Sequence, residues 1–463
     1  MSDRYSSPDF NPTRDLAELV ERARFDDLSG HAVESAKTFL LDTLGCGVAG
    51  GTGPRVDALI GTVAGWGEGA QATIWGDGRR VPAPQAALAN GYQIHALEWD
   101  CVHEPAVVHP MATLIPALMA HAERRSAAGR PVSGRDFLLA LSLGVEIAAM
   151  IGAASKSVMK FFRPATCGGF GVVAGLGSME RLDVSTLMHA FGIQYGQTSG
   201  TMQAHVEGSL LLGLQVGFNG RAGLSSIDLA MAGLTGPQQV LTGMYGYFKL
   251  FESEHDIAGW WPKLGREWQI TRLSHKPFPS GRLTHAAVDA IQQARAELGF
   301  DAQDVASISA SVPPLTHRLV GRPDIADPAP NYARLCIPYV CAITLLDGTC
   351  GPEAFAAARL SDPRVHEIAA RVTVSLDDNP DVNALWPQRF VITLRDGRRW
   401  ERRIDTPIGH PDNPLGRERH LAKFRKCWAI GGMPVARGEE LIARVDALEQ
   451  SPDAAELAGL LAR

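Results

Sequence analysis

The sequence predicts a mainly α protein in which a large all-α helical domain carries an inserted, smaller α+β lid domain. Three observations predict this fold class. Residues 1–250 place apolar side chains at helical spacing almost throughout, with no alternation of strands and helices. Short runs typical of strands begin near Trp268, and helical spacing returns after Thr406. At 463 residues the chain is also long enough for two domains.

The helices of the first part are predicted from apolar residues three and four positions apart. Several begin at Ser or Asp and end near Gly, as helix capping requires. They are rich in Ala and Gly, which lets neighbouring helices approach closely. The predicted helices cover residues 16–24, 31–50, 55–65, 84–97, 111–126, 133–153, 167–179, 183–192 and 212–232.

The α+β part is predicted from short strand-like runs with helices between them. Asp396-Gly397, between two of these runs, is a strong hairpin signal. The predicted strands are 268–274, 305–312, 371–376, 390–394 and 399–404, and the helices among them are 284–298 and 339–346. Three last helices follow at 416–428, 438–450 and 453–461. We therefore expect the helical domain to comprise residues 1–267 and 406–463, and the lid domain residues 268–405.

Composition and charge exclude several classes of protein. The net charge of -6 and a pI near 6.2 argue against a surface for nucleic acid or an anionic membrane. No N-terminal run resembles a signal peptide, and we expect no apolar stretch as long as a membrane span. The seven cysteines are scattered without a C-x-x-C pair, which favours reduced thiols over disulfides or a zinc site. These observations predict a cytoplasmic protein.

The densest polar motif is the segment 95–110, which holds three histidines and three carboxylates between two predicted helices. A short turn between buried helices takes titratable groups away from water, which shifts their pKa values. Acid–base chemistry is favoured, with His109 as the general acid/base and Asp100 or Glu98 orienting it. A metal site that includes His103 and a solvated surface loop are the alternatives. The irregular spacing of the potential ligands argues against metal.

A second polar motif lies where the helical part passes into the α+β part. Lys276, Arg282 and His285 offer three potential cations beside a helix N-terminus that Thr284 could cap. Cations at a helix N-terminus suit a carboxylate ligand. The alternative is a linker between domains whose basic residues are solvated.

The segments 95–110, 276–285 and 339–348 resemble the signatures of the MmgE/PrpD family, which includes 2-methylcitrate dehydratase, cis-aconitate decarboxylase and iminodisuccinate epimerase. Further matches follow in the right order over nearly the whole chain, at 163–166, 199–202, 207–209, 233–237, 411–415 and 423–424. The resemblance implies a helical domain with a smaller α+β lid, usually in a homodimer. It also implies an active site between the domains that works without metal or organic cofactor.

The chain departs from the family pattern at several polar positions. Cys101 and Val102 stand where the family shows Asp and Thr, and Arg163 stands where a histidine is usual. Leu212 and Gln215 replace a Lys-x-x-His pattern, so one cation and one imidazole are lost. These changes predict a substrate other than 2-methylcitrate, with fewer carboxylates or with an apolar substituent.

Residue roles follow from the matched positions. The resemblance implies that His109 is the acid/base, that Lys276 and His285 bind a substrate carboxylate, and that Tyr339 donates a proton or hydrogen bond. Arg163 is expected to add a bidentate carboxylate contact. The full set of expected site residues is His109, Asp100, Glu98, Tyr339 and Lys276 for catalysis, and Arg163, His285, Arg282 and His103 for substrate binding.

The function predicted from these residues is that of a cofactor-independent lyase, a dehydratase or hydratase of a small carboxylic acid. The shared chemical step is proton transfer alpha to a carboxylate, which needs a base and groups that bind the carboxylate. An isomerase or epimerase of a small dicarboxylate is the first alternative. The second is a non-catalytic binding protein on a decayed enzyme fold, which the losses at Val102, Leu212 and Gln215 favour.

Overall fold

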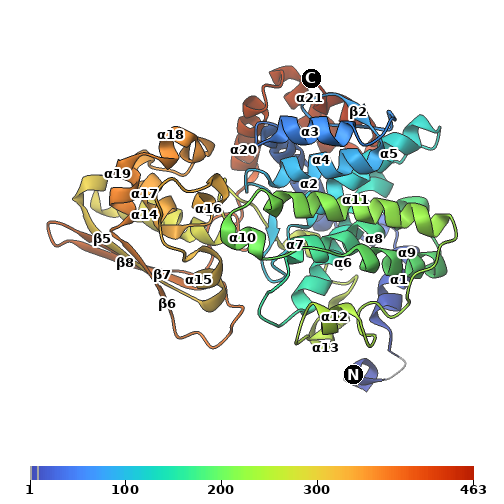
Figure 1. Cartoon of the computed structure of the whole chain (residues 1–463), viewed down its shortest axis with the longest axis horizontal. Coiled ribbons are helices and arrows are strands. Elements are labelled where there is room, and N and C mark those ends of the chain that lie inside the picture. The colour runs from blue at the N-terminus through green and yellow to red at the C-terminus, as the bar shows by residue number, and fades with distance from the viewer. Residues whose placement is uncertain (1–2, 8–9) are drawn as a thin grey trace.

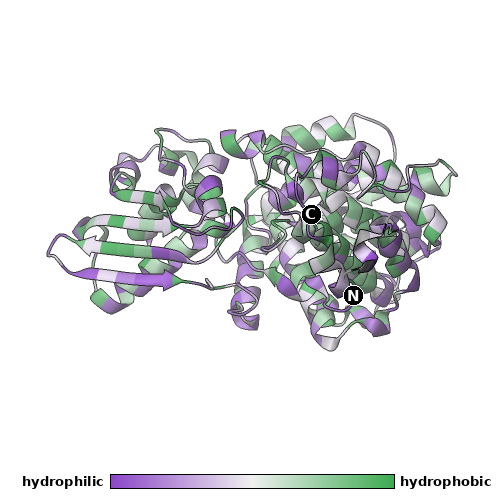
Figure 2. Ribbon diagram, turned by 90° about the horizontal axis from the view of Figure 1, so that it is seen from below, coloured by the Kyte–Doolittle hydropathy of each residue, from purple (hydrophilic) through white to green (hydrophobic). Residues whose placement is uncertain are grey.

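The computed structural model describes residues 3–7 and 10–463 and has a large helical part beside a smaller α+β part (Figure 1). The predicted mainly α fold class is confirmed, since helices make up most of the chain. Hydrophobic residues gather in the middle of the helical part, with hydrophilic residues around them (Figure 2). The bounds predicted for the two domains stay predictions.

All nine helices predicted between residues 16 and 232 are present, with ends that differ by a few residues. Ser29, Ser133 and Asp183 cap three of them through side-chain oxygens that accept backbone N–H groups. The predicted helices are α1 (Pro12–Arg22), α2 (Gly30–Gly50), α3 (Val56–Ala64), α4 (Ala83–His95), α5 (Pro110–Ala127), α6 (Gly134–Ala154), α8 (Gly168–Glu180), α9 (Val184–Gln197) and α11 (Leu211–Met231). The sequence did not predict four short helices, namely α7 (Arg163–Thr166), α10 (Gln203–Glu207), α12 (Tyr247–Leu250) and α13 (Ile257–Trp260).

The expectation that no apolar stretch is as long as a membrane span was wrong for α6. This helix is long and apolar enough to cross a membrane by length and composition alone, but its apolar window is completely buried inside the protein. It packs against α8 in the centre of the helical part. Its one acid in the middle, Glu146, is buried and accepts backbone N–H groups from Gly265 and Gln269. These properties are those of a central core helix.

The α+β part contains a four-stranded sheet in the order β6-β5-β7-β8. Strands β5 (Val305–Val312) and β6 (Val372–Leu376) are parallel, whereas β7 (Gln388–Leu394) and β8 (Arg399–Ile404) continue the sheet antiparallel through the predicted hairpin. Alternate residues of β7 are buried against α14 (His285–Leu298). The other helices of this part are α15 (Pro314–Val320), α16 (Pro330–Arg334), α17 (Ile337–Asp347), α18 (Ala357–Leu360) and α19 (Pro363–Ala369).

The strand predicted at 268–274 was wrong in extent and in place. Gln269–Arg272 is a 3-10 helix, and only β4 (Leu273–Ser274) is extended. It pairs with β3 (Val102–His103) and so lies outside the four-stranded sheet. The reason is that Gln269 binds Glu146 of α6 through its backbone N–H and His103 through its side chain. These buried polar contacts hold the segment on the helical part.

The last three helices return to the helical part. α20 (Arg417–Ile430) and α21 (Val435–Asp446) pack on α2, and α22 (Glu456–Leu461) contacts α5. Figure 1 shows the C-terminal end next to α21 at the top of the helical part. The two parts are therefore joined by two crossings of the chain.

Close packing of α4 on α11 places the end of α4 at the candidate site described below. A Cβ added at Gly91 of α4 would lie 2.9 Å from the Cα of Gly217 in α11. Gly91→Ala should therefore lower the free energy of unfolding by about 1–3 kcal/mol, because the two backbones would have to separate. Thermal or urea unfolding measures the change.

The control is Gly61→Ala in α3, where an added Cβ would meet nothing within 4 Å. Alanine is the better helix former, so this variant should gain about 0.5–1 kcal/mol. Equal effects of the two substitutions would contradict the close approach of α4 and α11.

Candidate active site

The site is built on the turn of residues 96–109 between α4 and α5. The turn carries β3, and a backbone bridge between His103 and Val108 closes it before His109 leads into α5. Glu98 and Val107 have positive φ values of 54°. This left-handed region is unfavourable for side chains other than glycine, above all for a β-branched one, and it concentrates at functional sites.

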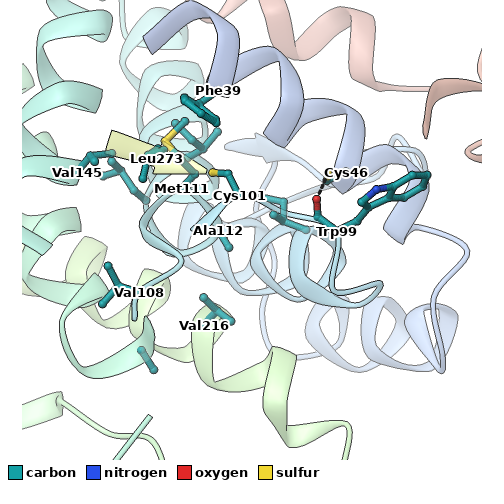
Figure 3. Close-up of a cluster of buried hydrophobic side chains, with 14 of the residues drawn as sticks. Phe39, Cys46, Trp99, Cys101, Val108, Met111, Ala112, Val145, Val216 and Leu273 are labelled. Atoms are coloured by element: carbon teal, nitrogen blue, oxygen red, sulfur yellow. Dashed lines mark hydrogen bonds between the residues drawn. The ribbon is translucent and has the colours of Figure 1, made fainter. Parts of the chain in front are cut away.

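Apolar packing beneath the turn holds it in place. Figure 3 shows Cys101 and Val108 of the turn in a cluster with Phe39 of α2, Val145 of α6 and Leu273 of β4. Burial raises the pKa of the Cys101 thiol well above its ordinary value. Cys101 therefore stays protonated and acts as a small hydrophobic residue.

The polar centre is the carboxylate of Asp100, which receives two imidazoles. Nδ1 of His95 lies 3.0 Å from Oδ1, and Nδ1 of His109 lies 2.9 Å from Oδ2. Burial raises the pKa of Asp100, but the two histidines outweigh burial and lower it below the ordinary value. An ionised carboxylate only accepts, so both histidines donate from Nδ1. Nε2 of His109 is thereby left with a free lone pair.

The two histidines differ in charge. Burial lowers the pKa of His95, yet the charges of Asp100 and of Glu98, which lies 3.0 Å from Nε2, raise it to about 10. Burial also lowers the pKa of His109, and with the help of the Lys276 charge it outweighs Asp100. At neutral pH His95 is an imidazolium and His109 is a neutral base.

Two ion pairs connect the turn to the second motif. Nζ of Lys276 lies 2.8 Å from Oε2 of Glu98 and also donates to the Glu98 carbonyl at 3.2 Å. Nε of Arg282 donates to Oε1 of Glu104 at 2.7 Å, and Ser274 donates to the same carboxylate. All four charged residues are buried.

A pocket lies over these groups, and both parts of the chain line it. Its polar lining consists of His95, Glu98, Glu104, His109, His205, Lys276 and Arg282. Its apolar lining is larger and consists of Val102, Val107, Met159, Phe162, Pro164, Met202, Leu283, Leu319, Val320, Leu335 and Leu385. Leu319 and Val320 come from α15 of the α+β part.

The structure brings together some of the expected site residues. Glu98, His109, Lys276 and Arg282 line the pocket, and Asp100 lies behind His109. Sequence reasoning missed the charged role of His95 and missed His205 entirely. His95 begins the dense motif, so its charge could have been suspected. The lone His205 carries no local signal.

Arg163 and Tyr339 lie outside the pocket lining, and their expected roles need correction. Nε and Nη2 of Arg163 each donate to Glu252 at 2.9 Å, so a buried carboxylate of the protein takes the place expected for the substrate. The hydroxyl of Tyr339 donates to the carbonyl of Ala354 at 2.6 Å inside the α+β part. Both side chains have partners within the protein, Glu252 and the Ser157 carbonyl for Arg163 and the Ala354 carbonyl for Tyr339.

His285 and His103 also lie outside this lining. His285 is buried behind Arg282, with Nδ1 3.4 Å from the guanidinium. Nδ1 of His103 accepts the N–H of Ala106 at 3.2 Å, and Nε2 lies 2.9 Å from the Gln269 oxygen. His103 therefore stabilises the turn, and His285 supports Arg282.

Leu212 and Gln215, the positions of the lost family pattern, lie outside the lining as well. Gln215 accepts the backbone N–H of Thr201 at 2.5 Å. Of the departures named from the sequence, Val102 alone is a lining residue.

Among the residues that the structure describes, two groups of side chains have ligand atoms close enough for a metal ion, namely His95, Asp100 and His109, and Asp42, His275 and His420. In the first group both Asp100 oxygens already accept from the histidines. In the second, Lys423 lies 2.8 Å from Asp42 and neutralises it. In each group the carboxylate charge is therefore already paired with a cation of the protein, His95 or Lys423. The absence of a metal stays a prediction.

Comparison with protein-family models identifies the family of the chain. The MmgE/PrpD N-terminal domain model matches residues 14–259, and the MmgE/PrpD C-terminal domain model matches residues 278–449. The chain belongs to the MmgE/PrpD family. The family's C-terminal model takes in α20 and α21, which pack on the helical part.

This chain is similar to curated proteins over most of their length. Cis-aconitate decarboxylase of Mus musculus is 28% identical over 97% of this chain and 93% of the relative. The Homo sapiens protein of the same name is 27% identical over 97% of this chain and 94% of the relative. The 2-methylcitrate dehydratase of Cupriavidus necator is 24% identical over 86% of each.

The Arg282–Glu104 pair should be a strong constraint on stability. Glu104→Gln keeps the shape but leaves the buried Arg282 charge without a carboxylate, which typically costs about 3–5 kcal/mol. We expect a large fall in the unfolding free energy measured with urea. The control is Glu439→Gln, which removes an exposed pair with Arg425 and should change stability little. A small effect at Glu104 would contradict the buried pair.

Proposed function

We propose that this MmgE/PrpD protein is a lyase, a dehydratase or hydratase that acts on a small carboxylic acid without metal or organic cofactor. The observation that carries the proposal is the Asp100–His109 pair, which leaves a neutral imidazole nitrogen at the pocket. The names of the curated relatives, decarboxylases and a dehydratase of small carboxylic acids, support the class.

His109 takes the proton next to the substrate carboxylate. Asp100 holds Nδ1–H, so the lone pair of Nε2 is the acceptor, and the carboxylate stabilises the imidazolium that forms. The electron pair of the broken C–H bond moves toward the substrate carboxylate. In dehydration the same electron pair then forms the double bond as the hydroxyl leaves from the neighbouring carbon. The hydroxyl takes the proton from the His109 imidazolium, so water is formed and His109 is neutral again.

Lys276 binds the substrate carboxylate. An ammonium group has three protons, and two of them bond to the carboxylate and the carbonyl of Glu98. The third is left for the substrate. Arg282 is less free, because its Nε, Nη1 and Nη2 all donate to Glu104 or to backbone carbonyls.

The pocket favours a substrate with few carboxylates. Each cation at the pocket is paired with a protein carboxylate, namely His95 and Lys276 with Glu98 or Asp100, and Arg282 with Glu104. The remaining lining is apolar, and a buried charge without a partner is strongly unfavourable. We propose a small acid with one carboxylate near Lys276 and an apolar group near Val102 and Phe162.

His109→Ala should lower kcat by roughly 10²–10⁴ because the base is removed. The fold should stay intact, which circular dichroism and thermal unfolding check. His31→Ala is the control, since His31 is an exposed residue of α2. Near-native turnover by the His109 variant would remove this histidine from the mechanism.

The activity should depend on pH through His109. The base must be neutral, so kcat/KM falls as the pH drops through its pKa, which lies below the ordinary 6.5. His95 keeps its charge over the same range because its pKa is raised to about 10. The pH–rate profile of the wild type measures this. An acid limb with its midpoint above pH 6.5 would argue against the assignment.

A screen of small acids in deuterium oxide tests the reaction class and the substrate. A lyase changes the substrate mass by water or carbon dioxide, whereas an epimerase exchanges one hydrogen for deuterium and changes the configuration. We expect water loss or addition with monocarboxylic acids, equally with and without a chelator. Efficient turnover of cis-aconitate or 2-methylcitrate, which carry three carboxylates each, would contradict the proposed substrate class.

A further inference from the structure

His205 is the one polar residue of the described pocket lining that neither sequence motif supplies. It lies on α10, and its ring is buried apart from the part that borders the pocket. It lines the same pocket as His109, the acid–base group, and the charges of Glu98 and His95 in that lining act on its pKa.

Arg322 fixes the position of the proton on the His205 ring. Its Nη2 lies 3.1 Å from Nδ1 of His205 and also donates to the His205 carbonyl at 3.1 Å. A guanidinium is always a donor, so Nδ1 must accept. The proton of the neutral ring therefore sits on Nε2, which forms no hydrogen bond with the residues that the structure describes.

The ring also stays neutral over the working pH range. Burial and the adjacent Arg322 charge lower the pKa of His205 to about 3. A neutral imidazole with its proton fixed on one nitrogen is a hydrogen-bond donor of constant direction. The neutral ring adds no charge to the pocket and therefore needs no counter-ion.

We propose that Nε2–H of His205 is a second donor for the carboxylate group of the substrate, beside Lys276. This deepens the proposed function and rests on it. When His109 removes the alpha proton, negative charge gathers on the carboxylate oxygens, and a fixed donor in an apolar pocket stabilises that charge. His205 keeps its own proton throughout. The proton that moves goes from carbon to Nε2 of His109.

Arg322 is the positioning residue of this subsite, and it joins the two parts of the molecule. It follows α15 of the α+β part, whereas His205 belongs to the helical part. Its guanidinium packs 4.8 Å from the ring centre of Tyr332, and Nη2 lies 3.2 Å from the carbonyl oxygen of Leu319, which shares the two Nη2 protons with His205. The donor direction of His205 thus depends on contact between the two parts.

Nitrogen NMR of the histidine rings tests the subsite without any substrate. We expect the His205 signals to report the neutral ring with the proton on Nε2 from pH 5 to pH 9. In Arg322→Leu the ring should change toward mixed tautomers or titrate within this range. Titration of His205 near pH 6.5 in the wild type, or a proton on Nδ1, would overturn the proposal whatever the reaction is.

Ligand binding is tested with 2-methylpropanoate, a branched monocarboxylate that matches the apolar pocket. Added at millimolar concentration, it should move the Nε2–H proton signal of His205 downfield, and His205→Leu should weaken binding about tenfold. An unchanged His205 signal at saturating 2-methylpropanoate would contradict the subsite.

Turnover separates this proposal from the proposed function. With the acid found active in the screen, His205→Leu should lose roughly 10²–10³ in kcat, and His205→Gln, which keeps a donor near Nε2, should recover part of it. The acid limb of the pH profile should stay in place, because His109 sets it. Loss of activity in His109→Ala with full activity in His205→Leu would overturn the subsite alone. Full activity in His109→Ala would overturn the proposed function.

Discussion

The buried carboxylate of Asp100 is the constraint on which the site depends. A charge without any contact with water must be compensated by the protein. The charged His95 balances the charge of Asp100, and the neutral His109 donates a hydrogen bond to it. The charged His95 in turn needs Glu98, and Glu98 needs Lys276. Positive and negative groups therefore alternate along one buried chain. The loss of a charged member, His95, Glu98 or Lys276, leaves its neighbour uncompensated, which is far more costly than the loss of an exposed pair.

This chain also explains why the pocket lies where the two parts meet. Glu98 and Glu104 belong to the turn on the helical part, whereas their partners Lys276 and Arg282 stand just before α14 of the α+β part. Trp386, from the loop before β7, donates to Glu104 from the other side. The polar contacts that close the floor of the pocket therefore also hold the two parts against each other.

The sequence predicted the local features of the fold and site. Helical spacing located the large helices, and the density of acids and histidines located the turn that holds His109. Contacts between residues far apart in the sequence were not predicted, because no local pattern encodes them. Arg163 was assigned to the substrate, but Glu252 lies far along the chain and takes both donors. Tyr339 stands at a position that matches the family pattern, yet its hydroxyl donates to the carbonyl of Ala354. The homodimer and the cytoplasmic location stay predictions.

The left-handed conformation of Val107 has a consequence for how this protein responds to selection. A β-branched residue in this conformation costs of order 1–3 kcal/mol, which glycine would recover, so the valine is a burden on the fold. The same side chain forms part of the apolar wall of the pocket. A library selected for heat resistance alone would therefore enrich glycine at this position and widen the pocket. Selection for stability and selection for a narrow choice of substrate act against each other at this single residue.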